Sequence, residues 1–216
     1  LYPPVRVDRF QPRGHKEDFY VTVSRLVSYK RIDLIVQAFA AMPQRKLFVI
    51  GDGPEMAMLK SHCPSNVTLL GWQQDEVVQQ YMAAARAFIF AAHEDFGISP
   101  VEAQACGTPV IAYGVGGAQE TVRDVRHLTE PTGLLFPHQT VASLMEAVDD
   151  FERLASRISP EACRQWAENF SEARFKAAFC TLVDEAWHHW NNAPQSVEHE
   201  VLRSRPQGLQ VDGLHG

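Results

Sequence analysis

The sequence predicts an α/β fold built on a Rossmann-like, doubly wound parallel sheet. Short apolar runs rich in Val, Ile and Phe alternate with segments of helical periodicity, and this alternation is typical of βαβ units. The runs are apolar over four or five residues, which indicates strands buried on both faces. A chain of 216 residues, 45% hydrophobic and 21% charged, is long enough to bury one substantial core.

We expect five strands and a short sixth, each bounded by helices or turns. The expected strands are residues 19–23, 46–50, 67–70, 87–90, 109–113 and 134–136. The first covering helix has an apolar face of Ile32, Ile35, Val36 and Phe39, and the second follows Asp75 as a capping residue. A third begins near Ser99 and Pro100 and stops at Gly107, which is a natural C-cap. Further helices are expected at 140–151, 159–166 and 171–190, the last with an apolar stripe.

Both ends of the chain differ from this pattern. Residues 1–18 are rich in Pro and charge and predict a linker segment, whereas residues 191–216 are polar and aperiodic and predict a tail. We therefore expect one domain over residues 19–190. Because the chain starts at Leu1 without an initiating Met, we expect it to be a fragment.

Charge and cysteine content exclude several classes of protein. The formal charge of −6 and the absence of a basic stripe argue against a nucleic-acid partner. Four dispersed cysteines show neither zinc-site spacing nor the density of a disulfide framework, and they predict buried thiols in a reducing cytoplasm. The sequence predicts no metal site and no apolar run long enough to cross a bilayer.

Ligands of open parallel sheets bind beyond the carboxyl ends of the strands, so the loops there carry the candidate site. The loop after the first strand holds Arg25 and Lys30, and the loop after the fourth runs from Glu94 to Glu102. Within that second loop, residues 96–98 precede a helix whose free amides and dipole suit a diphosphate. If the first and fourth strands are adjacent, Arg25 and Lys30 can neutralise the same phosphates.

The loop sequence E-D-F-G-I-S-P-V-E-A, with Glu94 and Glu102 eight residues apart, resembles the E-x(7)-E signature of the group 1 retaining glycosyltransferases. Residues from about 19 to 136 follow the same family in S-R-L-x(3)-K-R, V-I-G-D-G-P, G-T-P-V-I-A-Y and G-G-A-Q-E-T-V. The resemblance implies a two-domain GT-B architecture, in which residues 19–190 form the C-terminal, nucleotide-sugar-binding domain and a missing N-terminal domain binds the acceptor.

The resemblance also implies roles for single residues. Arg25 and Lys30 would stabilise the leaving diphosphate, and Glu94 would contact hydroxyl groups of the transferred sugar. Phe96, Gly97 and Ile98 would offer backbone amides to the donor, Glu102 would hold the ribose, and residues 70–75 would lie near the base. No cofactor or metal is implied, because the cations and the helix terminus stabilise the leaving group.

Several of these features have simpler interpretations. Ser99 and Glu102 also fit a capping box that needs no ligand, and Arg25 and Lys30 could be surface charges. Residues 51–54 predict a tight turn, whereas residues 114–117 fit a turn and a close ligand approach equally well. His93 stands beside Glu94, but a single histidine is more often structural than catalytic.

The predicted reaction is transfer of a hexosyl group, with retained configuration, from a nucleoside-diphosphate sugar to a glycan or lipid-linked acceptor. H-E-D-F-G-I-S-P-V-E-A and A-Y-G-V-G-G-A-Q-E-T-V resemble mannosyltransferases of polysaccharide assembly and favour GDP-mannose, with UDP-glucose as the main rival. Two alternatives remain open: a non-catalytic fragment that binds nucleotide sugars, and a GT-B-like UDP-sugar epimerase or synthase. We expect a cytoplasmic protein, with peripheral membrane association possible through the missing domain.

Overall fold

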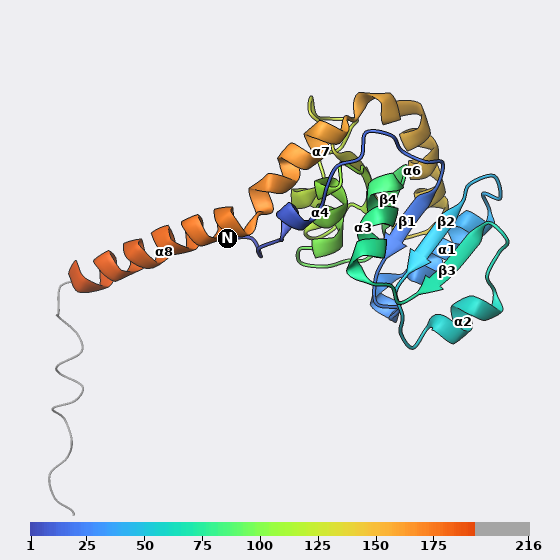
Figure 1. The fold of residues 1–216 in the computed structure, drawn as a ribbon, viewed down its shortest axis with the longest axis horizontal. Coiled ribbons are helices and arrows are strands. Elements are labelled where there is room, and N and C mark those ends of the chain that lie inside the picture. The colour runs from blue at the N-terminus through green and yellow to red at the C-terminus, as the bar shows by residue number, and fades with distance from the viewer. Residues whose placement is uncertain (193–216) are drawn as a thin grey trace, which may run out of the picture. The chain divides into compact units, whose positions relative to one another are not determined.

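The structure is a computed structural model that describes residues 1–192. The chain divides into two units, of which the first is Leu1–Lys176 and the second begins at Ala177. The first unit contains the whole sheet and the helices that cover it (Figure 1).

Six parallel strands form the sheet in the order β3-β2-β1-β4-β5-β6. The strands are β1 (Tyr20–Val23), β2 (Leu47–Ile50), β3 (Val67–Gly71), β4 (Ala87–Phe90), β5 (Val110–Tyr113) and β6 (Gly133–Phe136). The adjacency of β1 and β4, paired from Tyr20 opposite Ala87, reverses the direction of winding at this point. The predicted doubly wound, Rossmann-like fold class is therefore confirmed, and the switch point lies between β1 and β4.

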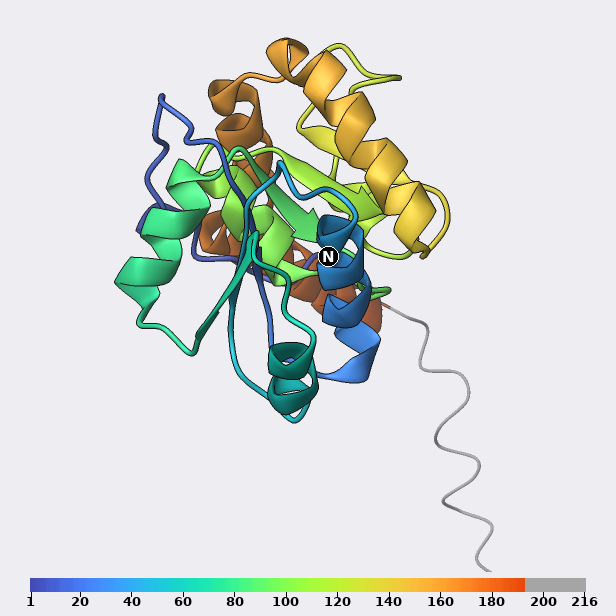
Figure 2. The ribbon, with the colours of Figure 1, turned by 90° about the vertical axis from the view of Figure 1, so that its right-hand side faces the viewer.

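Helices cover both faces of the sheet (Figure 2). They are α1 (Ile32–Ala40), α2 (Met56–Ser61), α3 (Asp75–Ala84), α4 (Ile98–Ala105), α5 (Ala118–Thr121), α6 (Val141–Leu154) and α7 (Pro160–Ala167). A further helix, α8 (Glu172–Asn192), follows them in the chain. Buried side chains form one cluster with α1 and α6 and another with α3 and α4. Neighbouring residues of β1 divide between them, Tyr20 in the first cluster and Val21 in the second.

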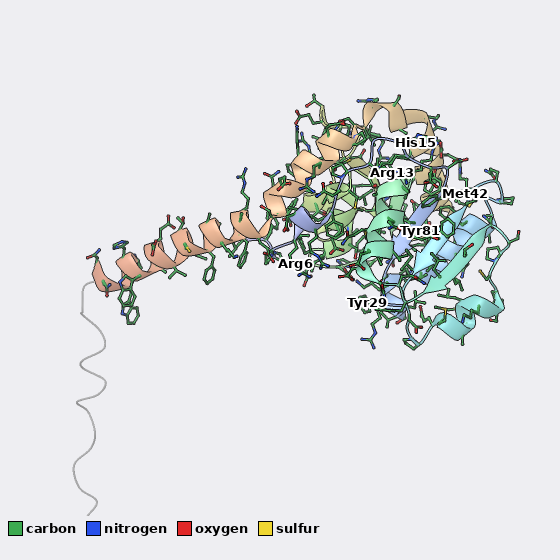
Figure 3. The ribbon with its side chains drawn as sticks, in the orientation of Figure 1. Arg6, Arg13, His15, Tyr29, Met42 and Tyr81 are labelled. Carbon is green, nitrogen blue, oxygen red and sulfur yellow. The ribbon has the colours of Figure 1, made fainter. Side chains whose placement is uncertain are left out.

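The segment before β1 packs on the sheet unit. Val5, Val7 and Phe10 are buried in the cluster with α3 and α4, and Val7 begins a short 3-10 helix, η1 (Val7–Arg9). Further along, the ammonium of Lys16 donates to the carbonyls of Ala83 and Cys106 and to the hydroxyl of Thr108. Figure 3 labels Arg6, Arg13 and His15 along this segment. Residues 1–18 thus contribute to the core, while their expected role as a linker between domains stays a prediction.

Helix α8 spans the boundary between the two units. It contains the predicted apolar stripe, and the large apolar side chains of its second part are exposed: Phe179, Leu182, Val183, Trp187 and Trp190. The tail expected at 191–216 has its first two residues in this helix, and its remainder lies outside the described residues. None of the helices in residues 1–192 has the length and hydropathy of a membrane-spanning segment.

A partly buried polar triad of Tyr20, Arg86 and Glu152 joins α6 to the sheet. The hydroxyl of Tyr20 donates to one carboxylate oxygen of Glu152, and the guanidinium of Arg86 donates to the other. Tyr20 is almost fully buried, and burial together with the hydrogen bond to Glu152 raises its pKa. We expect Glu152→Ala to lower the free energy of unfolding by about 1 to 3 kcal/mol, because it leaves the buried Tyr20 hydroxyl without its acceptor.

Urea-induced unfolding of the chain measures this loss. The matched control is Glu146→Ala, which removes an exposed carboxylate from the same helix and should change stability by less than about 0.5 kcal/mol. Equal losses in the two variants would show that the triad contributes nothing beyond ordinary helix propensity.

Candidate functional site

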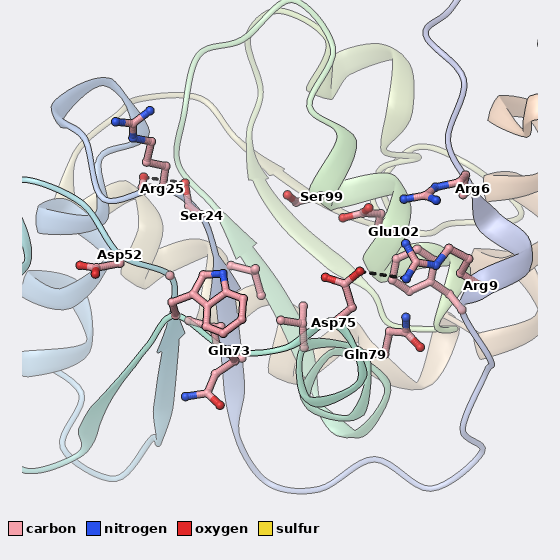
Figure 4. Close-up of a pocket in the computed structure, with 16 residues that line it drawn as sticks. Arg6, Arg9, Ser24, Arg25, Asp52, Gln73, Asp75, Gln79, Ser99 and Glu102 are labelled. Carbon is pink, nitrogen blue, oxygen red and sulfur yellow. Dashed lines mark hydrogen bonds and ion pairs between the residues drawn. The ribbon is translucent and has the colours of Figure 1, made fainter.

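A pocket of about 560 Å³ lies at the carboxyl ends of β1, β2 and β3 (Figure 4). Val23 and Ile50 form part of its lining as the last residues of β1 and β2. The segment after β3 contributes Trp72, which is 72% exposed. The pocket therefore occupies the edge of the sheet where doubly wound folds bind their ligands.

Two of the predicted site residues line this pocket. Arg25 follows β1 and is exposed, and Glu102 projects from α4. Burial raises the pKa of Glu102 and the nearby Asp75 carboxylate adds to this rise, whereas Arg6 and Arg9 lower it. The pocket therefore presents a partly buried carboxylate whose charge depends on its neighbours.

The N-terminus of α4 is not capped by a side chain. Its N-cap residue is Gly97, which has a φ of 81°, and the helix begins at Ile98 instead of near Ser99 and Pro100 as expected. A side chain at Gly97 would strain this left-handed backbone. Ser99 and Glu102 therefore do not form the capping box that their spacing allowed, and a capping role does not explain Glu102.

The remaining predicted residues lie in the adjoining loops. The Lys30 ammonium and the Glu94 carboxylate form an ion pair, with each side chain 20% exposed. The side chain of Phe96 is buried and packs against the rings of Tyr2 and Phe170, at centroid distances of 5.8 and 5.5 Å. The side chain of Phe96 thus anchors the loop, so only the backbone of this residue is available to contact a ligand. The Ile98 side chain is half exposed.

The glycines after β5 allow the two loops to approach closely. The amide of Gly117 donates to the carbonyl of Glu94 at 2.8 Å, and Gly116 forms a parallel bridge with Glu94. A Cβ atom at Gly116 would lie 2.4 Å from the Glu94 carbonyl oxygen, and one at Gly117 would lie 2.3 Å from the Cα of Phe96. Close approach of protein backbone thus explains Gly116 and Gly117 without a ligand.

The segment after β2 packs similarly against the loop after β1. A Cβ atom at Gly51 would lie 1.8 Å from the carbonyl oxygen of Ser24. The amide of Met56 donates to the carbonyl of Gly53, so the turn closed by this hydrogen bond spans residues 53–56, two residues later than expected. Gly51 and Asp52 also line the pocket, so this turn forms one of its walls.

The sequence did not predict the contribution of the N-terminal segment. Arg6 and Arg9 line the pocket beside Glu102, and the Arg9 guanidinium pairs with the Asp75 carboxylate at 2.8 Å. The signal in the sequence was faint: Val5, Val7 and Phe10 are apolar residues on either side of the two arginines. Across residues 1–192, no group of three His, Cys, Asp or Glu side chains is arranged to hold a metal ion.

Comparisons with known proteins identify relatives of this chain. Residues 6–172 match the family model described as glycosyl transferases group 1. D-inositol 3-phosphate glycosyltransferases of Mycobacterium bovis and Mycobacterium tuberculosis are 29% identical over 94% of this chain and 46% of their own length. The chain therefore spans about half the length of the curated relatives it matches.

Solved structures share the fold. A sucrose-phosphate synthase from Thermosynechococcus elongatus superposes with a TM-score of 0.71 at 24% identity, over 86% of this chain and 52% of that protein. Anabaena Alr3699/HepE in complex with UDP-glucose gives a TM-score of 0.63 at 24% identity, over 78% of this chain and 49% of that protein.

Proposed function

This chain belongs to the group 1 glycosyltransferases, and from that premise we propose that it binds the nucleoside-diphosphate sugar of a retaining glycosyltransferase. The observation that carries the proposal is the pocket at the carboxyl ends of β1 to β3, which has Arg25 and Glu102 in its lining. Nothing in the helix itself accounts for Glu102, since a glycine caps α4. A ligand with both phosphates and hydroxyl groups accounts for both residues.

In the proposed complex the diphosphate lies between Arg25, Lys30 and the uncapped amides at the start of α4. Cations and helix N-termini both stabilise phosphate oxygens. Glu102 accepts hydrogen bonds from the ribose, and the exposed ring of Trp72 offers a face on which the base can stack. Glu94 accepts hydrogen bonds from the transferred sugar. Phe96 to Ile98 contribute backbone amides only.

Transfer then requires the diphosphate to leave while the acceptor attacks from the same face. Arg25, Lys30 and the α4 terminus stabilise the negative charge that develops on the leaving group. Lys30 is paired with Glu94 in the free chain, so donor binding exchanges the Glu94 carboxylate for phosphate at the Lys30 ammonium. This exchange frees Glu94 to contact the sugar.

The acceptor-binding half belongs to a second, N-terminal domain in this proposal. The relatives are about twice as long as this chain, which supports such a domain. Residues 1–18 then form the linker segment, residues 19–190 the donor domain and residues 191–216 the tail. We also propose cytoplasmic action, with any attachment to the inner face of the membrane made by the other domain.

Calorimetric titration of the chain with UDP, GDP, UDP-glucose and GDP-mannose tests the proposal. We expect one nucleotide to bind preferentially, and Arg25→Ala and Glu102→Gln each to weaken it by about tenfold or more, since each removes a charged hydrogen-bonding partner. The structural neighbours share only the fold, so both uridine and guanosine donors belong in the panel. Binding that is unchanged in both variants would contradict the site.

A further inference from the structure

The segment that precedes the sheet brings two guanidinium groups to the donor pocket. Val5 and Val7 are buried, so Arg6 between them points away from the core, and Arg9 ends the short helix η1. Arg6 and Arg9 line the pocket together with Glu102. They also line an adjoining hollow of about 210 Å³ that Glu102 borders as well. The Glu102 carboxylate therefore has both arginines as neighbours.

The charges that line the pocket explain why these arginines matter. Its carboxylates are Asp52, Asp75 and Glu102, and its cations are Arg6, Arg9 and Arg25. Figure 4 shows Arg25 at the opposite end of the pocket from Glu102. Without Arg6 and Arg9, the end of the pocket at Glu102 would hold two carboxylates and no cation, which disfavours an ionised Glu102 and an anionic ligand.

Ionisation of Glu102 decides how well it can hold a ribose. A carboxylate accepts hydrogen bonds at both oxygens, whereas the protonated acid has an O–H in place of one acceptor. Burial raises the pKa of Glu102 and the Asp75 charge raises it further, whereas Arg6 and Arg9 oppose both effects. Arg9 in addition pairs with Asp75 at 2.8 Å and so reduces the repulsion between the two carboxylates.

Two other ionisable groups lie near Glu102. Glu172, the first residue of α8, borders the smaller hollow and adds another negative charge. Burial raises the pKa of the Cys106 thiol to about 12, so this group stays neutral wherever a carboxylate titrates. Among residues 1–192, the guanidinium of Arg6 has no hydrogen bond or ion pair of its own, and its charge lowers the pKa of Glu102.

We propose that Arg6 and Arg9 are positioning residues of the donor site, which act on the ribose through the carboxylate of Glu102. The inference rests on the proposed function and deepens it, because it makes the segment before β1 part of the nucleotide site. It also separates the two arginines from Arg25 and Lys30, which act on the phosphates directly.

The test is titration of the full chain with UDP and GDP between about pH 5 and pH 8, in the wild type and in Arg6→Ala/Arg9→Ala. We expect the alanine variant to bind about tenfold more weakly at the acid end and to approach the wild type at the alkaline end, because removal of the cations moves protonation of Glu102 to higher pH. Arg6→Lys/Arg9→Lys keeps the charge and should restore the wild-type pH profile. Unfolding curves of all variants check that they fold.

The same titrations on a Glu102→Gln background show whether the two arginines act through Glu102. Since glutamine does not titrate, we expect the two arginine substitutions to have no further effect there. An equal loss with and without Glu102 would mean that the arginines contact the nucleotide directly, and it would overturn the inference. Weakened binding in Glu102→Gln together with wild-type binding in Arg6→Ala/Arg9→Ala, where Glu102 is intact, would overturn the inference and leave the proposed function standing. Absence of binding in the folded wild-type chain would overturn both.

Discussion

Gly117→Ala is expected to destabilise the chain by about 3 kcal/mol or more, because its new methyl group has no space and its neighbours cannot move aside. The Cβ atom would lie 2.3 Å from the Cα of Phe96 and 2.4 Å from the carbonyl oxygen of Asp95, and both are backbone atoms. Gly117 itself has a φ of −61°, which alanine adopts readily. Without the clash the substitution would be neutral or slightly stabilising at this helix start, so the sign of the effect tests the packing.

Urea-induced unfolding measures the loss, with Gly14→Ala as the matched control. A Cβ atom at Gly14 meets nothing within 4 Å, so that variant should stay within about 0.5 kcal/mol of the wild type. A second measurement tests the site. The amide of Gly117 donates to the carbonyl of Glu94 and thereby positions the proposed donor loop. We therefore expect Gly117→Ala to bind nucleotide more weakly than the wild type under conditions in which the variant is folded. Wild-type stability in Gly117→Ala would mean that the two loops are further apart than the structure has them.

The sheet could be predicted closely from the sequence because its strands are buried on both faces and leave continuous apolar runs. The predicted strand at 87–90 coincides with β4, and each of the other five predicted strands differs from the observed strand by one residue at one end. Helices α2 and α5 went unpredicted because six and four residues are too few to show a helical period. The start of α4 was placed too late because Ser99 and Pro100 match a common capping pattern, whereas a left-handed glycine begins the helix.

The site could be predicted only in part, for a different reason. Arg25 and Glu102 follow sheet elements, so the topology alone directs them to the same edge. Arg9 and Asp75 are 66 residues apart in the chain, and their pairing depends on how Val5, Val7 and Phe10 pack on the sheet unit. Contacts of that kind follow from tertiary packing and leave no periodic pattern in the sequence.

The second large effect is expected at Lys30. Lys30→Ala should weaken binding of the preferred nucleotide sugar by about tenfold to a hundredfold, because it removes a charge-assisted contact with the diphosphate. Calorimetric titration measures the change, and Lys46→Ala is the matched control. Lys46 directly precedes β2 at the opposite edge of the sheet and is exposed, so its removal changes the net charge equally without reaching the pocket. Equal losses in both variants would mean that Lys30 acts only through the net charge of the protein and makes no direct contact with the diphosphate.

Glu94→Gln should change the binding of the nucleoside diphosphate and of the nucleotide sugar in different ways. In the free chain the Glu94 carboxylate holds the Lys30 ammonium, so the diphosphate has to compete with it. Without that charge, Lys30 is free, and we expect the nucleoside diphosphate to bind as tightly as in the wild type or more tightly. The nucleotide sugar should bind more weakly, because its hydroxyl groups lose a charged acceptor. Opposite changes for the two ligands would support both the exchange at Lys30 and the sugar contact of Glu94, whereas parallel losses would mean that Glu94 only orders the loop.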